Sequence, residues 1–174
     1  AGASFDHLHK QLVAIDERGV QHEQAMQRLQ VNPNIYNEYG VNYAAYHNLV
    51  IAESEHAVAF AGFGHRYPTI EVYSRSPEGV PWLQSPEEVR GMSDLLHAMH
   101  AATGADVASN EEWHYRPPGT TVAMPWRIML KWRVSTLAGF EGATKIYLNT
   151  IAPGTLRARV VARAERLPQL RHVR

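Results

Sequence analysis

The amino-acid sequence predicts an α+β fold in which helices pack on one face of an antiparallel sheet. Its 174 residues are enough for a domain with a hydrophobic core. Short apolar runs separated by turn residues are typical of antiparallel strands. One longer segment repeats apolar residues at helical spacing, and two others are rich in helix-forming residues. Helices and strands are therefore expected to form separate layers.

The first predicted elements are a short strand and a helix. Residues 11–15 are an apolar run that predicts a strand. Residues 21–30 are rich in Gln, Glu, Ala, Met and Leu, which favour a helix. The Asn-Pro-Asn sequence at residues 32–34 is expected to end that helix.

Three predicted strands follow. Residues 48–53 and 57–61 are apolar runs joined by a short polar turn, which predicts an antiparallel hairpin. In residues 69–74, isoleucine and valine alternate with Glu71 and Tyr73. Strict alternation is typical of a strand with one face in the core and one face in water, so this strand is predicted to be half-buried.

The clearest helix signal begins at Ser85. Ser85 is a good N-cap, Pro86 suits the first helical position, and two glutamates follow in the first turn. Apolar residues then recur at helical spacing as far as Gly104, where the helix is expected to end. One face of this helix should therefore pack on the sheet.

The last third of the chain continues the same pattern. Residues 110–115 and 126–134 are predicted strands, and residues 139–142 a turn. Residues 145–150 are expected to form a last strand, and the Arg- and Ala-rich residues 156–167 a terminal helix.

Composition excludes several classes of function. Lys plus Arg and Asp plus Glu each number 17, and this balance disfavours a nucleic-acid-binding protein. The sequence contains no cysteine, so it offers no disulfide, no thiolate metal ligand and no thiol nucleophile. No apolar run approaches the length of a membrane span, and no leader is visible. We therefore expect a cytoplasmic protein without membrane association.

The opening segment carries the strongest chemical pattern. His7, His9 and Gln11 alternate, and alternate residues of a strand share a face. The small residues before them, Ser4 included, allow backbone and ligand to approach closely. A neutral imidazole can attack phosphorus, and an amide can stabilise the phosphate oxygens as charge develops. The pattern therefore favours a histidine nucleophile acting on a phosphate.

The spacing His7-x-His9-x-Gln11 resembles the active-site motif of the galactose-1-phosphate uridylyltransferase branch of the histidine-triad superfamily. Residues 46–74 and 126–153 resemble, in the same order, parts of the second triad-like half of these transferases. The resemblance implies a histidine-triad-like antiparallel sheet. It assigns residues 1–31 to the end of a first triad-like half, and residues 32–174 to the second half with its C-terminal helix. We therefore expect the chain to be the C-terminal portion of a longer protein, and to be inactive alone.

The resemblance also implies roles for individual residues. His9 matches the nucleophile that carries the nucleotidyl group covalently, and Gln11 matches the residue that hydrogen-bonds its phosphate. Ser4 and Glu141 match substrate-binding positions, and Glu141 would contact sugar hydroxyls, in some relatives across a dimer interface. His7 matches a structural zinc ligand whose companions would lie upstream of this chain.

The sequence departs from the family in its second half. Pro125 and Arg127 stand where histidines are expected, so a second metal site is not expected there. His114 and Tyr115 could still line the sheet face beside this position. The preferred interpretation of the histidines that begin or border strands, His65 and His114 among them, is nevertheless that they are ordinary loop and edge residues.

The leading interpretation is a nucleotidyltransferase that moves a nucleoside monophosphate, preferentially UMP, between a nucleotide-sugar and a sugar 1-phosphate through His9. An adenylyltransferase or a dinucleoside-polyphosphate phosphorylase is the second interpretation, since those enzymes also carry His-x-His-x-Gln. A catalytically silent nucleotide-binding or interaction relative is the third, motivated by Pro125 and Arg127. Members of the family are commonly dimers, so a homodimer stays an open alternative.

Overall fold

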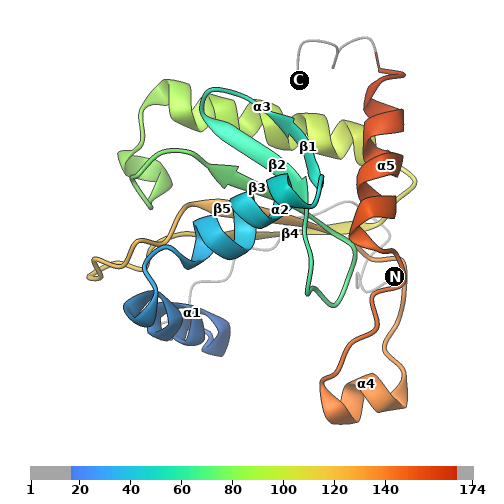
Figure 1. Cartoon of the computed structure of the whole chain (residues 1–174), viewed down its shortest axis with the longest axis horizontal. Coiled ribbons are helices and arrows are strands. Elements are labelled where there is room, and N and C mark those ends of the chain that lie inside the picture. Colours follow the sequence, from blue (N-terminus) through green and yellow to red (C-terminus); the bar gives the residue numbers. More distant parts are fainter. Residues whose placement is uncertain (1–16, 168–174) are drawn as a thin grey trace.

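The computed structural model describes residues 17–167, which contain one antiparallel sheet (Figure 1). Its five strands are arranged in the order β1-β2-β3-β5-β4, and each neighbouring pair is antiparallel. The strands are β1 (Val50–Glu53), β2 (Ala57–Ala61), β3 (Thr69–Ser74), β4 (Ser109–His114) and β5 (Arg127–Trp132). The predicted α+β class with an antiparallel sheet is confirmed.

Helices precede, interrupt and follow these strands. They are α1 (Val20–Val31), the π-helical segment η1 (Asn37–Asn42), α2 (Tyr43–Tyr46), the 3₁₀ segment η2 (Pro81–Leu83), α3 (Pro86–Thr103), α4 (Gly139–Thr144) and α5 (Pro153–Ala164). Helices α3 and α5 contact each other and the sheet (Figure 1). The indole N–H of Trp132 in β5 donates to the Thr103 hydroxyl of α3 at 3.0 Å, so α3 covers the face of the sheet that carries Trp132.

Local capping signals set the ends of α3. The Ser85 hydroxyl accepts a hydrogen bond from the Glu88 N–H at 3.2 Å, and the Glu88 carboxylate accepts one from the Ser85 N–H at 2.8 Å. This reciprocal pair is a capping box, which satisfies two amides at the helix start. At the other end Gly104 has a φ of +89°, a conformation that favours glycine. Both predicted ends of this helix are confirmed.

The core beneath α3 and α5 is close-packed because β2 presents small residues to it. Ala57, Ala59 and Ala61 alternate along β2 and are fully buried. Short side chains let the helices approach the strand closely. Larger side chains fill the adjoining layer, namely Ile70, Val72, Leu95, Met99, Ile128 and Leu130.

The opposite face of the sheet is also covered. The Tyr36 and Tyr73 rings lie 6.2 Å apart, and the rings of His22 in α1 and His114 in β4 lie 5.1 Å apart. All six residues of β3 are therefore buried. The prediction that this strand is half-buried is wrong, because alternation along one strand does not reveal that another segment packs on its polar side.

Two expectations for residues 139–150 are also corrected. The predicted turn is the short helix α4, and the predicted last strand is irregular. The Glu141 carboxylate accepts hydrogen bonds from the N–H groups of Ala138 and Leu148, at 2.9 and 3.1 Å. These bonds fold the segment back on itself, so it does not extend along the sheet. Figure 1 shows α4 projecting away from the strands.

The described part of the chain bears on two further expectations. Helix α1 packs through Met26 and Leu29 against Met124. The expected boundary at residue 31, between the first and second triad-like halves, stays a prediction. Within residues 17–167, no helix combines the length and the apolar character that a membrane crossing requires.

Candidate functional site

Most residues of the predicted active-site motif lie outside the described residues. This is true of Ser4, His7, His9 and Gln11, so their roles stay predictions. Glu141 is described, and backbone N–H groups occupy its carboxylate and lower its pKa. In this conformation Glu141 stabilises its own loop, and its proposed contact with sugar hydroxyls stays a prediction.

Ionisable side chains gather on the face of the sheet opposite α3. In the register of the sheet, Tyr73 of β3 lies beside Arg127 of β5, and Arg127 lies beside His114 of β4. Residues two positions apart on a strand share a face, so the same side carries several more polar groups. We call this surface the polar face, and its ionisable residues are Glu71, Tyr73, Glu112, His114, Arg127 and Lys131.

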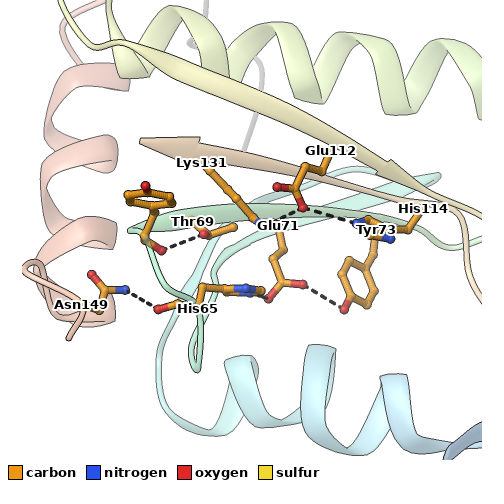
Figure 2. Close-up of polar contacts among 9 residues, drawn as sticks. His65, Thr69, Glu71, Tyr73, Glu112, His114, Lys131 and Asn149 are labelled. Carbon is orange, nitrogen blue, oxygen red and sulfur yellow. Dashed lines mark hydrogen bonds and ion pairs between the residues drawn. The ribbon is translucent and has the colours of Figure 1, made fainter. Parts of the chain in front are cut away.

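The buried carboxylate of Glu71 on the polar face contacts both Tyr73 and His65, which lies in the loop after β2 (Figure 2). Glu71 is 5% exposed; its Oε1 lies 2.9 Å from His65 Nε2, and its Oε2 accepts a hydrogen bond from the Tyr73 hydroxyl at 3.0 Å. Burial alone would raise the pKa of Glu71, but the His65 and Tyr73 hydrogen bonds and the Arg127 charge lower it overall. Burial and the Glu71 charge raise the pKa of Tyr73. Glu71 is therefore ionised, and Tyr73 remains a donor.

A second carboxylate ties β4 to β5. Glu112 Oε2 lies 2.6 Å from Lys131 Nζ and 3.7 Å from His114 Nε2 (Figure 2). The second distance is longer than an ordinary hydrogen bond. The His114 ring and the Lys131 ammonium lower the pKa of Glu112 to about 2.

Arg127 is the buried cation of the polar face. It is 5% exposed, and its guanidinium carbon lies 4.2 Å from the centroid of the Tyr36 ring. Among the described residues, none accepts a hydrogen bond from its Nε or Nη1, and none forms a hydrogen bond with the buried Nε2 of His114. Burial and then the His114 and Arg127 charges lower the pKa of His22 beside them. Arg127 is therefore a buried guanidinium with donors that no described residue accepts.

A cavity of about 450 Å³ opens over these groups. Helix α1, the loop after β2 and the polar face enclose it, and its walls include Arg28, Tyr36, His65, Glu71, His114 and Arg127. The cavity offers a fixed guanidinium, imidazole rings and one buried carboxylate. Among residues 17–167, no group of three or more His, Asp or Glu side chains could hold a metal ion, so the zinc expectation rests on His7.

The cavity shows what the sequence left hidden. His114 lines the sheet face beside Arg127, which the sequence offered only as the alternative to an ordinary edge residue. From the sequence, Arg127 is only a replacement for an expected histidine, and His65 only a loop residue. A charged residue within the apolar run of β5 was the signal for a buried cation. The link between His65 and Glu71 had no comparable signal.

Solved structures of several other proteins share this fold. A GalT-like protein from Arabidopsis thaliana superposes with a TM-score of 0.76 at 22% identity, covering 92% of this chain and 56% of that one. A uridylyltransferase mutant gives 0.69 at 15% identity, covering 84% and 53%. An ADP-glucose phosphorylase from Arabidopsis thaliana, solved with bound ADP-glucose, gives 0.63 at 21% identity, covering 77% and 46%. The chain thus spans about half the length of these proteins.

A search of curated proteins gives no match. The family model described as "Domain of unknown function (DUF4921)" matches residues 1–174. The expected resemblance to galactose-1-phosphate uridylyltransferases is confirmed at the level of the fold. The chain therefore belongs to the DUF4921 family, and its fold is that of the GalT-like proteins.

Proposed function

We propose that the protein containing this chain transfers a nucleoside monophosphate, preferentially UMP, between a nucleotide-sugar and a sugar 1-phosphate. The observation that carries the proposal is the sequence His7-x-His9-x-Gln11 in a chain with a GalT-like fold. The similar structures include a uridylyltransferase and an ADP-glucose phosphorylase, and both names denote transfer at a phosphate. Because a fold alone does not determine function, the motif is the necessary second argument.

The proposed reaction has two displacements at one phosphorus. A ring nitrogen of His9 attacks the α-phosphorus of the nucleotide-sugar, and a P–N bond forms as the P–O bond to the sugar phosphate breaks. The sugar 1-phosphate leaves with the electron pair. A second sugar 1-phosphate then attacks the same phosphorus through oxygen, the P–N bond breaks, and His9 is regenerated. Gln11 donates a hydrogen bond to a phosphate oxygen, while Ser4 and Glu141 bind substrate.

Labelling tests this reaction directly. The full-length protein is incubated separately with UDP-glucose and ADP-glucose that carry ³²P at the α-phosphate. Label on His9 that survives alkali and is lost in acid is expected for a phosphoramidate. His9→Ala should abolish the label, and His97→Ala, at an exposed position in α3, should retain it. Equal labelling of the wild type and His9→Ala would refute the proposal.

The same experiment separates the alternatives. Preferential labelling by ADP-glucose favours an adenylyltransferase, an alternative supported by the similarity to an ADP-glucose phosphorylase. Diadenosine tetraphosphate with inorganic phosphate tests the dinucleoside-polyphosphate phosphorylase reaction. Nucleotide binding without label or turnover would favour the silent relative suggested by Pro125 and Arg127. Zinc analysis of the wild type and His7→Ala tests the proposed metal ligand.

A homodimer is the proposed assembly. Phe140, Ile146 and Leu148 lie in and beside the projecting α4, and 64%, 64% and 73% of their respective surfaces are exposed. Exposed apolar residues gathered on one segment mark a contact surface. Sedimentation equilibrium should therefore show a dimer that Phe140→Ser weakens. A wild-type monomer at all concentrations would refute this assembly.

A further inference from the structure

The polar face contains a positive charge that its described surroundings leave without a hydrogen-bonded anion. Arg127 is 5% exposed, and neither Nε nor Nη1 has an acceptor among residues 17–167. A buried cation is normally paired, since removing it from water is costly. The Tyr36 ring, 4.2 Å from the guanidinium carbon, interacts with the charge through its π-face. It accepts none of the Arg127 N–H groups.

The carboxylate of the cavity is already occupied. Oε1 of Glu71 contacts His65 at 2.9 Å, and Oε2 accepts the Tyr73 hydroxyl at 3.0 Å. The Glu71 charge lowers the electrostatic cost of burying the Arg127 guanidinium, but the two side chains form no hydrogen bond. The guanidinium therefore keeps unused donors beside the cavity.

Two neighbouring side chains lie beside Arg127 or the cavity, and the Glu112 carboxylate lies 3.7 Å from the first of them, His114. His114, the β4 neighbour of Arg127, has a buried Nε2 without a hydrogen-bond partner in the described chain. Arg28 lies in the α1 wall of the same cavity. Arginine is well suited to oxyanions because its planar donors match the geometry of carboxylate and phosphate groups.

From these contacts we propose that the cavity is a binding site for the phosphate or carboxylate group of a small metabolite, with Arg127 as its main anchor. Its volume of about 450 Å³ is typical of small-molecule sites. Tyr36, Tyr39 and Phe63 also line it, so they supply aromatic surface for the uncharged part of the ligand. Arg127 holds the anionic group, and His114 donates a further hydrogen bond when its Nε2 carries a proton.

Anion titration of the full 174-residue chain tests the site. Inorganic phosphate and acetate serve as separate probes, at ionic strength held constant with chloride, and calorimetry measures binding. At least one probe should bind saturably. Arg127→Gln should weaken the affinity for that probe tenfold or more, and Arg127→Lys should have an intermediate effect. Arg90→Gln, at an exposed position in α3, should leave the affinity unchanged. Phosphate alone or acetate alone identifies the chemical class, and failure of both overturns the proposal.

A second measurement keeps the test decisive if the Arg127 variants do not fold. In the wild-type chain, the imidazole NMR signals of His114 should shift saturably with the bound probe, while those of the exposed His97 should not. Equal or non-saturable shifts at both rings would overturn the proposal.

The test is also independent of the proposed transfer reaction. His9→Ala should retain probe binding even though it abolishes labelling. Probe binding lost equally in His9→Ala and Arg127→Gln would instead place the anion at the nucleophile and overturn the proposal. Failure of the labelling experiment alone leaves the anion site standing.

Discussion

The buried carboxylate of the polar face gives a sharp prediction, the effect of Glu71→Gln. Glutamine has nearly the same shape as glutamate, so the substitution leaves packing almost unchanged. Its single oxygen can accept the Tyr73 hydrogen bond, and its NH₂ group then faces His65 Nε2, where a hydrogen bond survives only if the ring moves its proton to Nδ1. The substitution therefore removes the charge that strengthens both contacts, at 2.9 and 3.0 Å, and disrupts the native bond to His65.

The expected cost follows from those two bonds. A hydrogen bond to a charged group contributes roughly 1.5–3 kcal/mol, and a neutral one about 1 kcal/mol. Losing the charged bond to His65 and converting the other to a neutral one costs roughly 2–5 kcal/mol, from which the relief of no longer burying a charge must be subtracted. We expect the free energy of unfolding to fall by about 2–3 kcal/mol at pH 7. The melting temperature should fall by roughly 5–10 °C.

The pH dependence supplies a second, independent check. The pKa of Glu71 is lower in the folded chain than its ordinary value of 4.5. Its ionised form therefore stabilises the fold above about pH 4.5, and this contribution is lost as the pH falls through the folded pKa. The difference between wild type and Glu71→Gln should be largest at neutral pH and should shrink in acid.

Urea unfolding followed by circular dichroism, at pH 7 and at pH 4, measures both effects. Glu55→Gln, at an exposed position in the turn between β1 and β2, is the matched control and should change stability by less than about 0.5 kcal/mol. A double-mutant cycle with Tyr73→Phe should show coupling of about 1 kcal/mol. A cost equal to that of the control, or the same cost at both pH values, would refute the reasoning.

Two further substitutions test packing beside and behind the polar face. In Gly62→Ala the added Cβ would lie 2.7 Å from Glu71 Oε1, so unfolding should become easier by about 1–3 kcal/mol. Gly154→Ala, where nothing lies within 4 Å, should be near neutral in the same urea assay, and equal effects would contradict the steric argument. Trp132→Phe removes the donor at 3.0 Å from the Thr103 hydroxyl and should cost about 1–3 kcal/mol by the same measurement. Adding Thr103→Val should recover part of that loss, because no unpaired hydroxyl remains; a larger loss in the double variant would argue against it.

Local signals were sufficient wherever a feature depends on neighbouring residues. The start of α3 was predictable because Ser85 and Glu88 cap each other within one turn. The hairpin of β1 and β2 was predictable because two apolar runs flank a short polar turn. The segment at residues 145–150 was not, because the bonds from Glu141 to its own loop compete with strand pairing.

The polar face shows the same contrast between features that depend on neighbouring residues and features that depend on distant ones. Local sequence patterns were enough to predict the fold class and the capped helix α3, and they reveal a His-x-His-x-Gln motif suited to phosphate chemistry. Only the tertiary structure brought His65 to Glu71 and laid Tyr36 over Arg127. The contact between Tyr36 and Arg127 joins residues far apart in the chain. Whether a polar side chain faces water or a buried cavity depends on which segment covers its strand, and periodicity along that strand carries no such information.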